Sequence, residues 1–334
     1  MNFYNLLKIN SLIKNFRIKF LGLWLLNVLN KRTLAIFLDP MLACNLRCVM
    51  CHFSDNKKRA NLKGKFTDKD LELFAKSLFP NALKLQIGCG AEPTLYPNVE
   101  KIIMLAKHYQ IPFISLTTNV ILLTAEKINA YANAGLDEFI ISLHGVRKET
   151  YESFMVGANH DIFVKNITLI GETKKQNPNL QLRVNYTFNQ DNFDEIKDIF
   201  SLFENTKIDV LQLRPISNMG DTVYQNFDLS PLKNKYSTFI EQIKYEAKLR
   251  GTTLLCNDNL IPNNSETENT NSFLMPYTSC YASPKACWYD SFDFREETFR
   301  KWSKRTHWKM KIFRNIFRSK TYFKQSKALK YSVY

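Results

Sequence analysis

Short apolar runs alternate with longer segments of helical periodicity over residues 33–214. Six runs predict buried strands because they are apolar and bounded by turn residues: 33–38, 83–87, 112–116, 138–143, 182–188 and 210–214. Helical patterns at 67–79, 98–109, 124–134, 149–154, 161–174 and 193–204 separate them. This alternation predicts a parallel sheet with right-handed crossovers, either an open doubly wound sheet or a partial barrel. In both, the functional residues gather at the carboxyl ends of the strands.

The pattern changes outside this region. Residues 232–249 predict a long helix, residues 252–256 an extra strand, and the Asn- and Ser-rich residues 257–271 a loop. Residues 20–29 (FLGLWLLNVL) are apolar but too few to cross a bilayer, which takes about 20 residues. No small-residue cleavage site follows them, so we expect an amphipathic helix and not a signal peptide. Its apolar face would pack on the protein body or lie in a membrane interface.

Charge is concentrated at the two ends of the 334-residue chain. The net charge is +15, and residues 1–32 contain six Lys or Arg and no acid, while residues 300–330 contain twelve and no acid. With 45% hydrophobic residues and 25 Phe, the chain can bury a sizeable core. The basic ends suit an anionic partner, either a membrane surface or an anionic macromolecule, or they are solvated tails without a fixed partner.

Three of the seven cysteines lie on one short segment, Cys44, Cys48 and Cys51 in CNLRCVMC. Thiolates this close together favour a metal site over disulfides and indicate a reducing cytoplasm. A structural zinc or a closed iron–sulfur cluster takes four protein ligands, so three cysteines leave one position open. From the residues alone three alternatives remain: zinc with His52 as a ligand, a C-x-x-C-H haem attachment site, and a redox pair or buried thiols.

The segment CNLRCVMC resembles the CxxxCxxC signature of the radical SAM superfamily. In that family the three cysteines hold a [4Fe–4S] cluster on the loop after the first strand of a partial (β/α)₆ TIM-like barrel. Met50 fills the hydrophobic position of the motif, whose backbone lies near the adenine of S-adenosylmethionine (SAM) in the family. The resemblance therefore implies an α/β fold of this barrel type, with the motif on the loop after residues 33–38.

The segment after the second predicted strand resembles the GGEP element that binds the amino group of SAM in this family. It consists of Gly90, Ala91, Glu92 and Pro93, so the second Gly of the element is Ala91 here. The acid is kept, and a carboxylate offers charge-assisted acceptors to an ammonium group. The resemblance therefore implies that Gly90, Ala91 and Glu92 contact SAM.

Matches continue at the ends of later strands. Thr118 and Asn119 belong to a TTN element, and Ser142 and His144 to an S-x-D/H-G element that in the family lies near the methionine or ribose part of SAM. At the fifth and sixth strands the resemblance places residues that tend to contact SAM or substrate: Arg183, Asn185, Gln212 and Arg214. The resemblance covers about residues 33–220, so this chain is similar to the family over a whole domain and not in one motif alone.

The resemblance implies an enzyme. A low-potential donor such as ferredoxin or flavodoxin reduces the cluster, SAM is cleaved to a 5′-deoxyadenosyl radical, and the radical abstracts hydrogen from a substrate that the sequence does not identify: a peptide, a small molecule or RNA. The alternative is an iron–sulfur sensor or scaffold that keeps the cluster without radical chemistry. We expect the enzyme, because a sensor has no need of the SAM-binding residues. The location implied is the cytoplasm, either free or peripheral to the membrane.

The sequence divides into three parts. Residues 1–32 form an N-terminal helical segment, residues 33–250 the radical SAM core, and residues 251–334 an extension. Cys256, Cys280 and Cys287 in the extension are fewer than the cysteines of the SPASM or twitch extensions of many relatives. They hold one auxiliary cluster in a divergent extension, or they are idle thiols in a lid with a basic tail.

Overall fold

One curved sheet organises the protein. The computed structural model describes residues 3–217, 222–257, 260, 270–287, 289–323 and 332–333. The strand order is β8-β1-β2-β3-β4-β5-β6-β7-β9. The strands are β1 Leu34–Leu38, β2 Ala82–Ile87, β3 Phe113–Thr118, β4 Glu138–Leu143, β5 Gln181–Phe188, β6 Val210–Pro215, β7 Thr253–Cys256, β8 Ser279–Ala282 and β9 Ser332–Val333. From β8 to β7 neighbouring strands are parallel, and β9 is antiparallel to β7.

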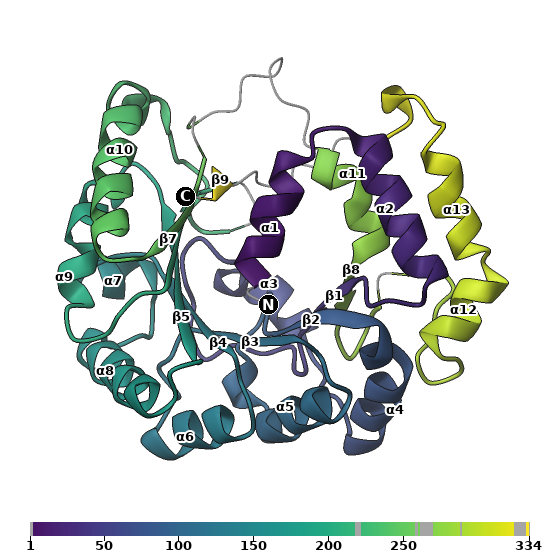
Figure 1. Ribbon diagram of the computed structural model, residues 1–334. Coiled ribbons are helices and arrows are strands. Elements are labelled where there is room, and N and C mark those ends of the chain that lie inside the picture. The colour runs from purple at the N-terminus through teal and green to yellow at the C-terminus, as the bar shows by residue number, and fades with distance from the viewer. Residues whose placement is uncertain are drawn as a thin grey trace.

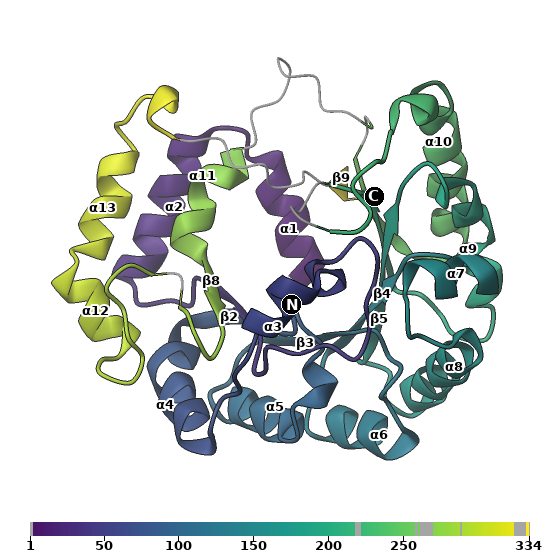
Figure 2. The ribbon, with the colours of Figure 1, turned by 180° about the vertical axis from the view of Figure 1, so that it is seen from behind.

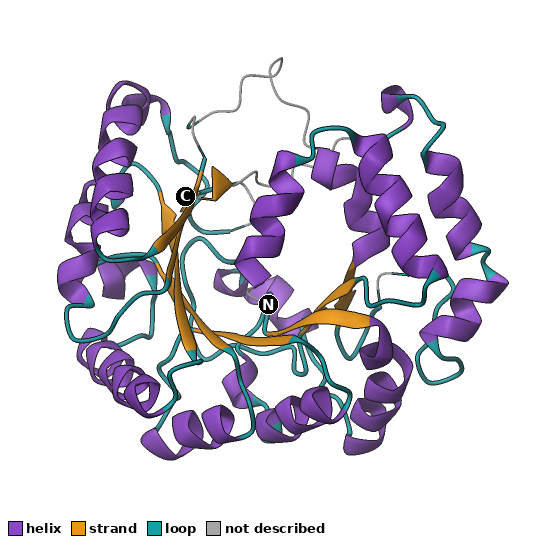
Figure 3. Ribbon diagram, viewed as in Figure 1, coloured by secondary structure: helices purple, strands orange, loops and turns teal. Residues whose placement is uncertain are grey.

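Helices cover the outer face of this sheet, as Figure 3 shows. They are α4 Asp68–Leu78, α5 Val99–His108, α6 Ala125–Asn133, α7 Lys148–Phe154, α8 His160–Gln176, α9 Ile199–Leu202, α10 Lys233–Leu249, α11 Thr270–Thr278, α12 Phe299–Arg305 and α13 Trp308–Asn315, whereas α3 Asn56–Asn61 follows the loop after β1 and lies within the ring. Local signals explain where several begin. Thr67 caps α4 by accepting a hydrogen bond from Asp70 N, and Thr124 caps α6 by accepting one from Lys127 N.

The predicted partial barrel is confirmed, with additions at both edges. The six predicted strands are β1 to β6, and the predicted extra strand is β7. The predicted helix at residues 193–204 is instead a 3₁₀ helix, Phe193–Asp198, followed by the short α9. Side chains anchor the start of this segment: Asn192 donates to His144 O, and Glu195 accepts from Val146 N. The predicted loop at residues 257–271 lies largely outside the described residues.

The C-terminal part contributes to the same sheet as the core. β8 lies beside β1, with Ala35 paired to Ser279 and Phe37 to Tyr281. β7, β8 and β9 all come from residues 251–334. The division of the chain at residue 250 stays a prediction, and part of the predicted basic tail lies outside the described residues.

Alternate residues of each strand face the barrel interior. Residues in register on neighbouring parallel strands point to the same side, and the pairs include Ser115 with Glu138, and Asn185 with Gln212. The other set packs under the helices and forms the core, for example Leu85, Leu116, Phe139, Ile141, Leu182 and Leu211. The barrel interior is therefore polar, whereas the layer between sheet and helices is apolar.

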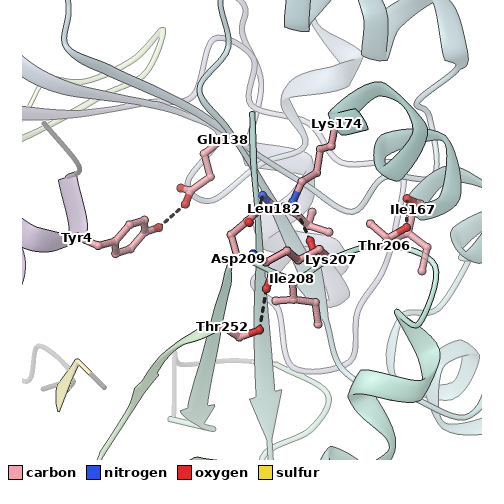
Figure 4. Close-up of polar contacts among 10 residues, drawn as sticks. All are labelled: Tyr4, Glu138, Ile167, Lys174, Leu182, Thr206, Lys207, Ile208, Asp209 and Thr252. Atoms are coloured by element: carbon pink, nitrogen blue, oxygen red, sulfur yellow. Dashed lines mark hydrogen bonds and ion pairs between the residues drawn. The ribbon is translucent and has the colours of Figure 1, made fainter. Parts of the chain in front are cut away.

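Helix α1 (Phe3–Leu12) lies inside the ring of strands and helices, near the amino-terminal ends of the strands (Figure 1). Tyr4 donates a hydrogen bond to Glu138, the first residue of β4, and Figure 4 shows the two side chains pointing toward each other. Lys84 Nζ lies 4.6 Å from the centre of the Phe3 ring. Helix α1 thus closes this end of the barrel.

Helix α2 (Phe16–Val28) contains most of the apolar run at residues 20–29, where a helix is predicted. It packs against α11 and α13. None of the helices within the described residues has the length and apolar character needed to cross a bilayer.

Candidate functional site

The three cysteines lie on the loop between β1 and α3, at the carboxyl end of β1. Cys44, Cys48 and Cys51 are all half-buried. The segment that follows α7 holds this loop in place, because Arg47 N donates a hydrogen bond to Val156 O at 2.8 Å. The predicted position of the motif in the fold is therefore the observed one.

The three thiols lie near enough to influence one another's charge, in a poorly solvated place. Burial raises the pKa of Cys44 to about 12, and it raises the pKa of Cys48 and Cys51 as well. The neighbouring sulfurs add to this for Cys48, because Cys51 and Cys44 as thiolates would repel its charge. Metal coordination deprotonates a thiol outright, so a bound metal would compensate for this cost.

The donor set fits a cluster better than a single ion. Over the part of the chain that the structure describes, no three His, Cys, Asp or Glu side chains are arranged to hold one metal ion. In a four-iron cluster each thiolate binds a different iron, so the sulfurs stand farther apart than around one ion. Zinc would take a fourth ligand, and His52, whose Nδ1 lies 3.9 Å from Cys51 Sγ, does not form a metal-ion site with the cysteines in the described structure.

Glu92, on the loop after β2, is buried and accepts four hydrogen bonds within the protein. Its Oε1 accepts from Thr94 N at 3.1 Å, Thr94 Oγ1 at 2.6 Å and Thr118 Oγ1 at 2.7 Å, and its Oε2 accepts from Asn119 N at 2.8 Å. Burial raises the pKa of Glu92, and these donors oppose that rise. Three donors saturate Oε1, whereas Oε2 accepts one hydrogen bond and keeps an acceptor position that a ligand could use. Glu92 therefore joins the ends of β2 and β3, and its contact with SAM stays a prediction.

Asn119 connects this carboxylate to the cysteine loop. Its Nδ2 donates to Asn45 Oδ1 at 2.9 Å and lies 4.0 Å from Cys44 Sγ. The predicted residues Glu92, Thr118 and Asn119 therefore form one hydrogen-bonded unit, and that unit touches the loop of Cys44.

Asp39 is a site residue that sequence reasoning missed. It follows β1 directly, is only 1% exposed, and accepts from Cys89 N at 2.7 Å, Gly90 N at 2.9 Å and Tyr281 Oη at 2.9 Å. It therefore holds the Gly90 loop against β8. The sequence does contain a signal for Asp39, because it is an acidic residue directly after a buried strand, as the other predicted site residues follow theirs.

Ser142 and His144 reach the same end of the barrel from β4. His144 Nδ1 and Arg214 Nε are both buried and lack a hydrogen-bond partner in the described structure. Burial, assisted by the positive charge of Arg214, lowers the pKa of His144 to about 4, so the imidazole is neutral at neutral pH. Thr187 pairs in register with Arg214 and lies one step beyond the pair of Leu143 and Tyr186, which puts His144 and Arg214 at the same level.

Met50 is nearly buried beside the cysteine loop. Its sulfur lies 3.6 Å from Asn189 Nδ2, and its side chain packs with Phe154 and Ile216. The packing fixes the backbone between Cys48 and Cys51.

Arg183 groups with two other predicted residues, Asn185 and Gln212, away from the cysteine loop. It is the third residue of β5, near the end closed by α1, and it donates to Asn185 Oδ1 at 2.8 Å, to Tyr4 Oη at 3.2 Å and to Gln212 Oε1. The structure therefore gives Arg183 a place in the polar network under α1 and not beside the cysteines.

The three C-terminal cysteines do not come together. Cys280 Sγ and Cys287 Sγ are 3.6 Å apart, next to the isolated bridge between Ala282 and Cys287. Cys256 is on β7, and six strands separate β7 from β8 in the sheet. A three-cysteine auxiliary site gains no support from this arrangement.

A sequence comparison identifies the family. The family model described as "Radical SAM superfamily" matches residues 38–203, which contain the cysteine loop and the strand ends described above. The chain belongs to the radical SAM superfamily. The cofactors of this superfamily are a [4Fe–4S] cluster and SAM, as predicted, and solved structures that share the fold contain bound SAM.

Curated relatives match parts of this radical SAM chain. A "Probable GTP 3',8-cyclase" of Sulfolobus acidocaldarius is 26% identical over 196 residues, which is 58% of this chain and 60% of the relative. One of Methanococcus maripaludis is 36% identical over 126 residues, 37% of this chain and 41% of the relative. The chain therefore spans less than two thirds of either relative.

Solved structures share the fold at low identity. Streptococcus suis SuiB bound to S-adenosylmethionine aligns with a TM-score of 0.58 and 18% identity, over 76% of this chain and 59% of that one. The protein anSMEcpe with bound AdoMet and Cp18Cys peptide aligns with a TM-score of 0.56 and 16% identity, over 88% and 86%. The radical SAM barrel is thus shared over most of the chain.

Proposed function

We propose that this chain is a radical SAM enzyme that holds its [4Fe–4S] cluster on Cys44, Cys48 and Cys51. The observation that supports this most is the loop itself: three half-buried thiols lie near one another at the carboxyl end of β1. A hydrogen-bonded unit centred on Glu92 and Asn119 supports that loop. When bound and reduced, the cluster supplies an electron to SAM, whose C–S bond breaks to give methionine and a 5′-deoxyadenosyl radical.

The protein's own part is to bind and orient SAM. We propose that the backbone of Gly90 and Ala91 receives the SAM amino group, because Asp39 and Glu92 hold that loop rigidly from both sides. Ser142 lies on the inward row of β4, and its hydroxyl has no partner within the described residues, so it is available to the methionine or ribose part.

His144 and Arg214 provide donors at the same end. A neutral imidazole and a guanidinium with an unpaired Nε suit an anionic or hydrogen-bond-accepting group of SAM or substrate. We propose that the substrate presents such a group here. The substrate classes to test first are those of the named relatives: GTP, and a peptide such as the precursor that SuiB binds.

The partners we propose are a low-potential electron donor, ferredoxin or flavodoxin, and an anionic membrane surface or macromolecule at the basic termini. Because a reduced cluster and free thiols need a reducing environment, we place the reaction in the cytoplasm. The rival function is an iron–sulfur sensor or scaffold without radical chemistry.

Anaerobic reconstitution tests the proposal. The wild-type chain should bind about four iron and four sulfide per chain, and with SAM and dithionite it should release 5′-deoxyadenosine and methionine. The triple variant of Cys44, Cys48 and Cys51 to Ala should lose both the iron and the cleavage. The matched control replaces Cys256, Cys280 and Cys287 with Ala and should keep them.

Two results would contradict the proposal. If the wild-type chain holds its cluster but yields no 5′-deoxyadenosine, the sensor or scaffold function replaces the enzyme. If the control variant loses half of the iron, a second cluster exists and one cluster is too few.

A further inference from the structure

Helix α2 has apolar side chains on two opposite sides. Its inner side packs into the protein: the Phe20 ring lies 5.7 Å from that of Tyr277 on α11, and Trp24 lies 5.0 Å from Phe313 on α13. The inner side therefore already holds the helix in place, and the outer side is not needed for that.

The outer side forms an exposed apolar stripe. Ile18, Leu21, Leu25 and Val28 are spaced three or four residues apart along one side of the helix. Together with Leu29, which caps the helix and lies four residues after Leu25, they define what we call the outer stripe. Their exposed fractions are 55%, 42%, 45%, 42% and 64%. Soluble surfaces rarely expose contiguous apolar residues on this scale without a partner. Leu12, at the end of α1, is also 73% exposed.

The charged residues that adjoin the outer stripe in sequence and on α13 are all basic. Lys14, Arg17 and Lys31 are exposed next to it in sequence, and residues 1–32 contain no acid. Helix α13, also without an acid, lies beside the end of α2, where Lys309 Nζ donates to Asn30 Oδ1 at 3.3 Å. An apolar stripe with a purely basic border matches the lipid interior and the anionic headgroups of a membrane surface together.

Helix α2 lies on the side of the barrel away from α3, the helix that follows the cysteine loop. Helices α1 and α2 are nearest the viewer in Figure 1, whereas α3, which follows the cysteine loop, is nearest in Figure 2, the view from behind. A membrane that contacts α2 on that side would leave the cysteine end of the barrel open to a soluble electron donor and substrate.

We propose that the outer stripe of α2 inserts into the interface of an anionic lipid membrane and attaches the protein to one leaflet. The helix has 13 residues, about 20 Å at 1.5 Å per residue, which is less than the roughly 30 Å of a bilayer core. The helix therefore lies in the interface and does not span it. This inference develops the anionic partner proposed above and is independent of the cluster.

Vesicle co-sedimentation of the full chain tests this proposal. Vesicles of phosphatidylcholine with 30% phosphatidylglycerol should bind the wild-type chain, pure phosphatidylcholine much less, and salt near 1 M should release it. The variant Leu21→Gln/Leu25→Gln should bind at least about tenfold more weakly, because two apolar side chains are no longer transferred from water into the membrane. The control Met104→Gln/Leu249→Gln removes two apolar side chains elsewhere that are even more exposed, 57% and 64%, and should bind like the wild type.

Three outcomes would overturn the proposal. They are no binding of the wild-type chain to anionic vesicles, equal binding of the outer-stripe variant, and an equal loss in the control. Light scattering adds a fourth: if the wild-type chain is a dimer and the Leu21→Gln/Leu25→Gln variant a monomer, the stripe is covered by a second copy. None of these results changes the release of 5′-deoxyadenosine, so the enzyme proposal is judged separately.

Discussion

Replacing Glu92 with Gln separates two roles for this residue. The amide has nearly the shape of the carboxylate but turns one acceptor oxygen into an NH₂ donor. All four hydrogen-bond partners of Glu92 are donors: Thr94 N, Thr94 Oγ1, Thr118 Oγ1 and Asn119 N. The hydroxyls can rotate and accept, but the two backbone N–H groups cannot.

Either orientation of the amide leaves one buried backbone N–H facing an NH₂ group. With the oxygen at the Oε1 position, Asn119 N loses its acceptor, and with the oxygen at the Oε2 position, Thr94 N loses it. A buried donor without a partner costs about 1–3 kcal/mol, and removal of a buried charge offsets part of this. We therefore expect Glu92→Gln to lower the free energy of unfolding by about 1–2 kcal/mol without any SAM present.

Anaerobic denaturant unfolding without SAM, paired with a SAM-binding titration, decides between the roles. A residue that acts only by binding the SAM ammonium would leave the stability of the SAM-free protein unchanged and weaken SAM binding alone. The control Glu172→Gln removes the same charge from an exposed position in the interior of α8 and should match the wild type in both measurements. Wild-type stability of Glu92→Gln would refute the positioning role.

Three further predictions concern other parts of the fold. Tyr4→Phe removes the hydroxyl that donates to Glu138 and should lower the free energy of unfolding by about 1–3 kcal/mol; an unchanged urea midpoint would contradict a role for α1 in closing the barrel. Burial lowers the pKa of His144 to about 4, whereas the imidazole has a pKa of about 6.5 in the unfolded chain. As the pH falls below about 6.5, the unfolded chain therefore binds a proton at His144 that the folded protein does not bind. Stability should therefore fall with pH between about 6.5 and 4, and less steeply in His144→Gln, as thermal melts across that range will show. Gly88→Ala should destabilise strongly, because Gly88 has φ of +83° and a Cβ there would lie 2.5 Å from a carbonyl oxygen of β3, whereas Gly22→Ala, with no atom within 4 Å, should stabilise α2 by about 0.5–1 kcal/mol in the same unfolding assay.

Local patterns predict much of the barrel because its parallel strands are short and apolar and its helices have clear starts. The strand at residues 138–143 and the Thr67 cap of α4 are both visible in the sequence. Since the carboxyl ends of parallel strands share one edge, the meeting of Glu92, Thr118 and Asn119 also follows from the strand prediction.

Contacts between distant segments are not visible in such patterns. β8 lies within a segment rich in aromatic residues and Cys, and its pairing with β1 depends on the whole intervening chain. The side-chain network under α1 is similar: Tyr4 meets Glu138 across 134 residues, and Arg183 belongs to that network although its strand alone suggested the SAM site. A sequence motif also does not reveal that most of the hydrogen-bonding capacity of Glu92 is used within the protein.

The enclosed position of α1 has a consequence for motion. Helix α1 precedes all the strands and takes no part in their pairing. It can therefore detach while β1 to β8 stay paired, in a local opening that costs less free energy than global unfolding. Such an opening would admit water to Glu138, Lys84 and Arg183 while the cysteine loop at the other end remains ordered. Amide hydrogen exchange should then show α1 exchanging well before the central strands. The end of the barrel closed by α1 would open independently of the end that holds the cysteine loop.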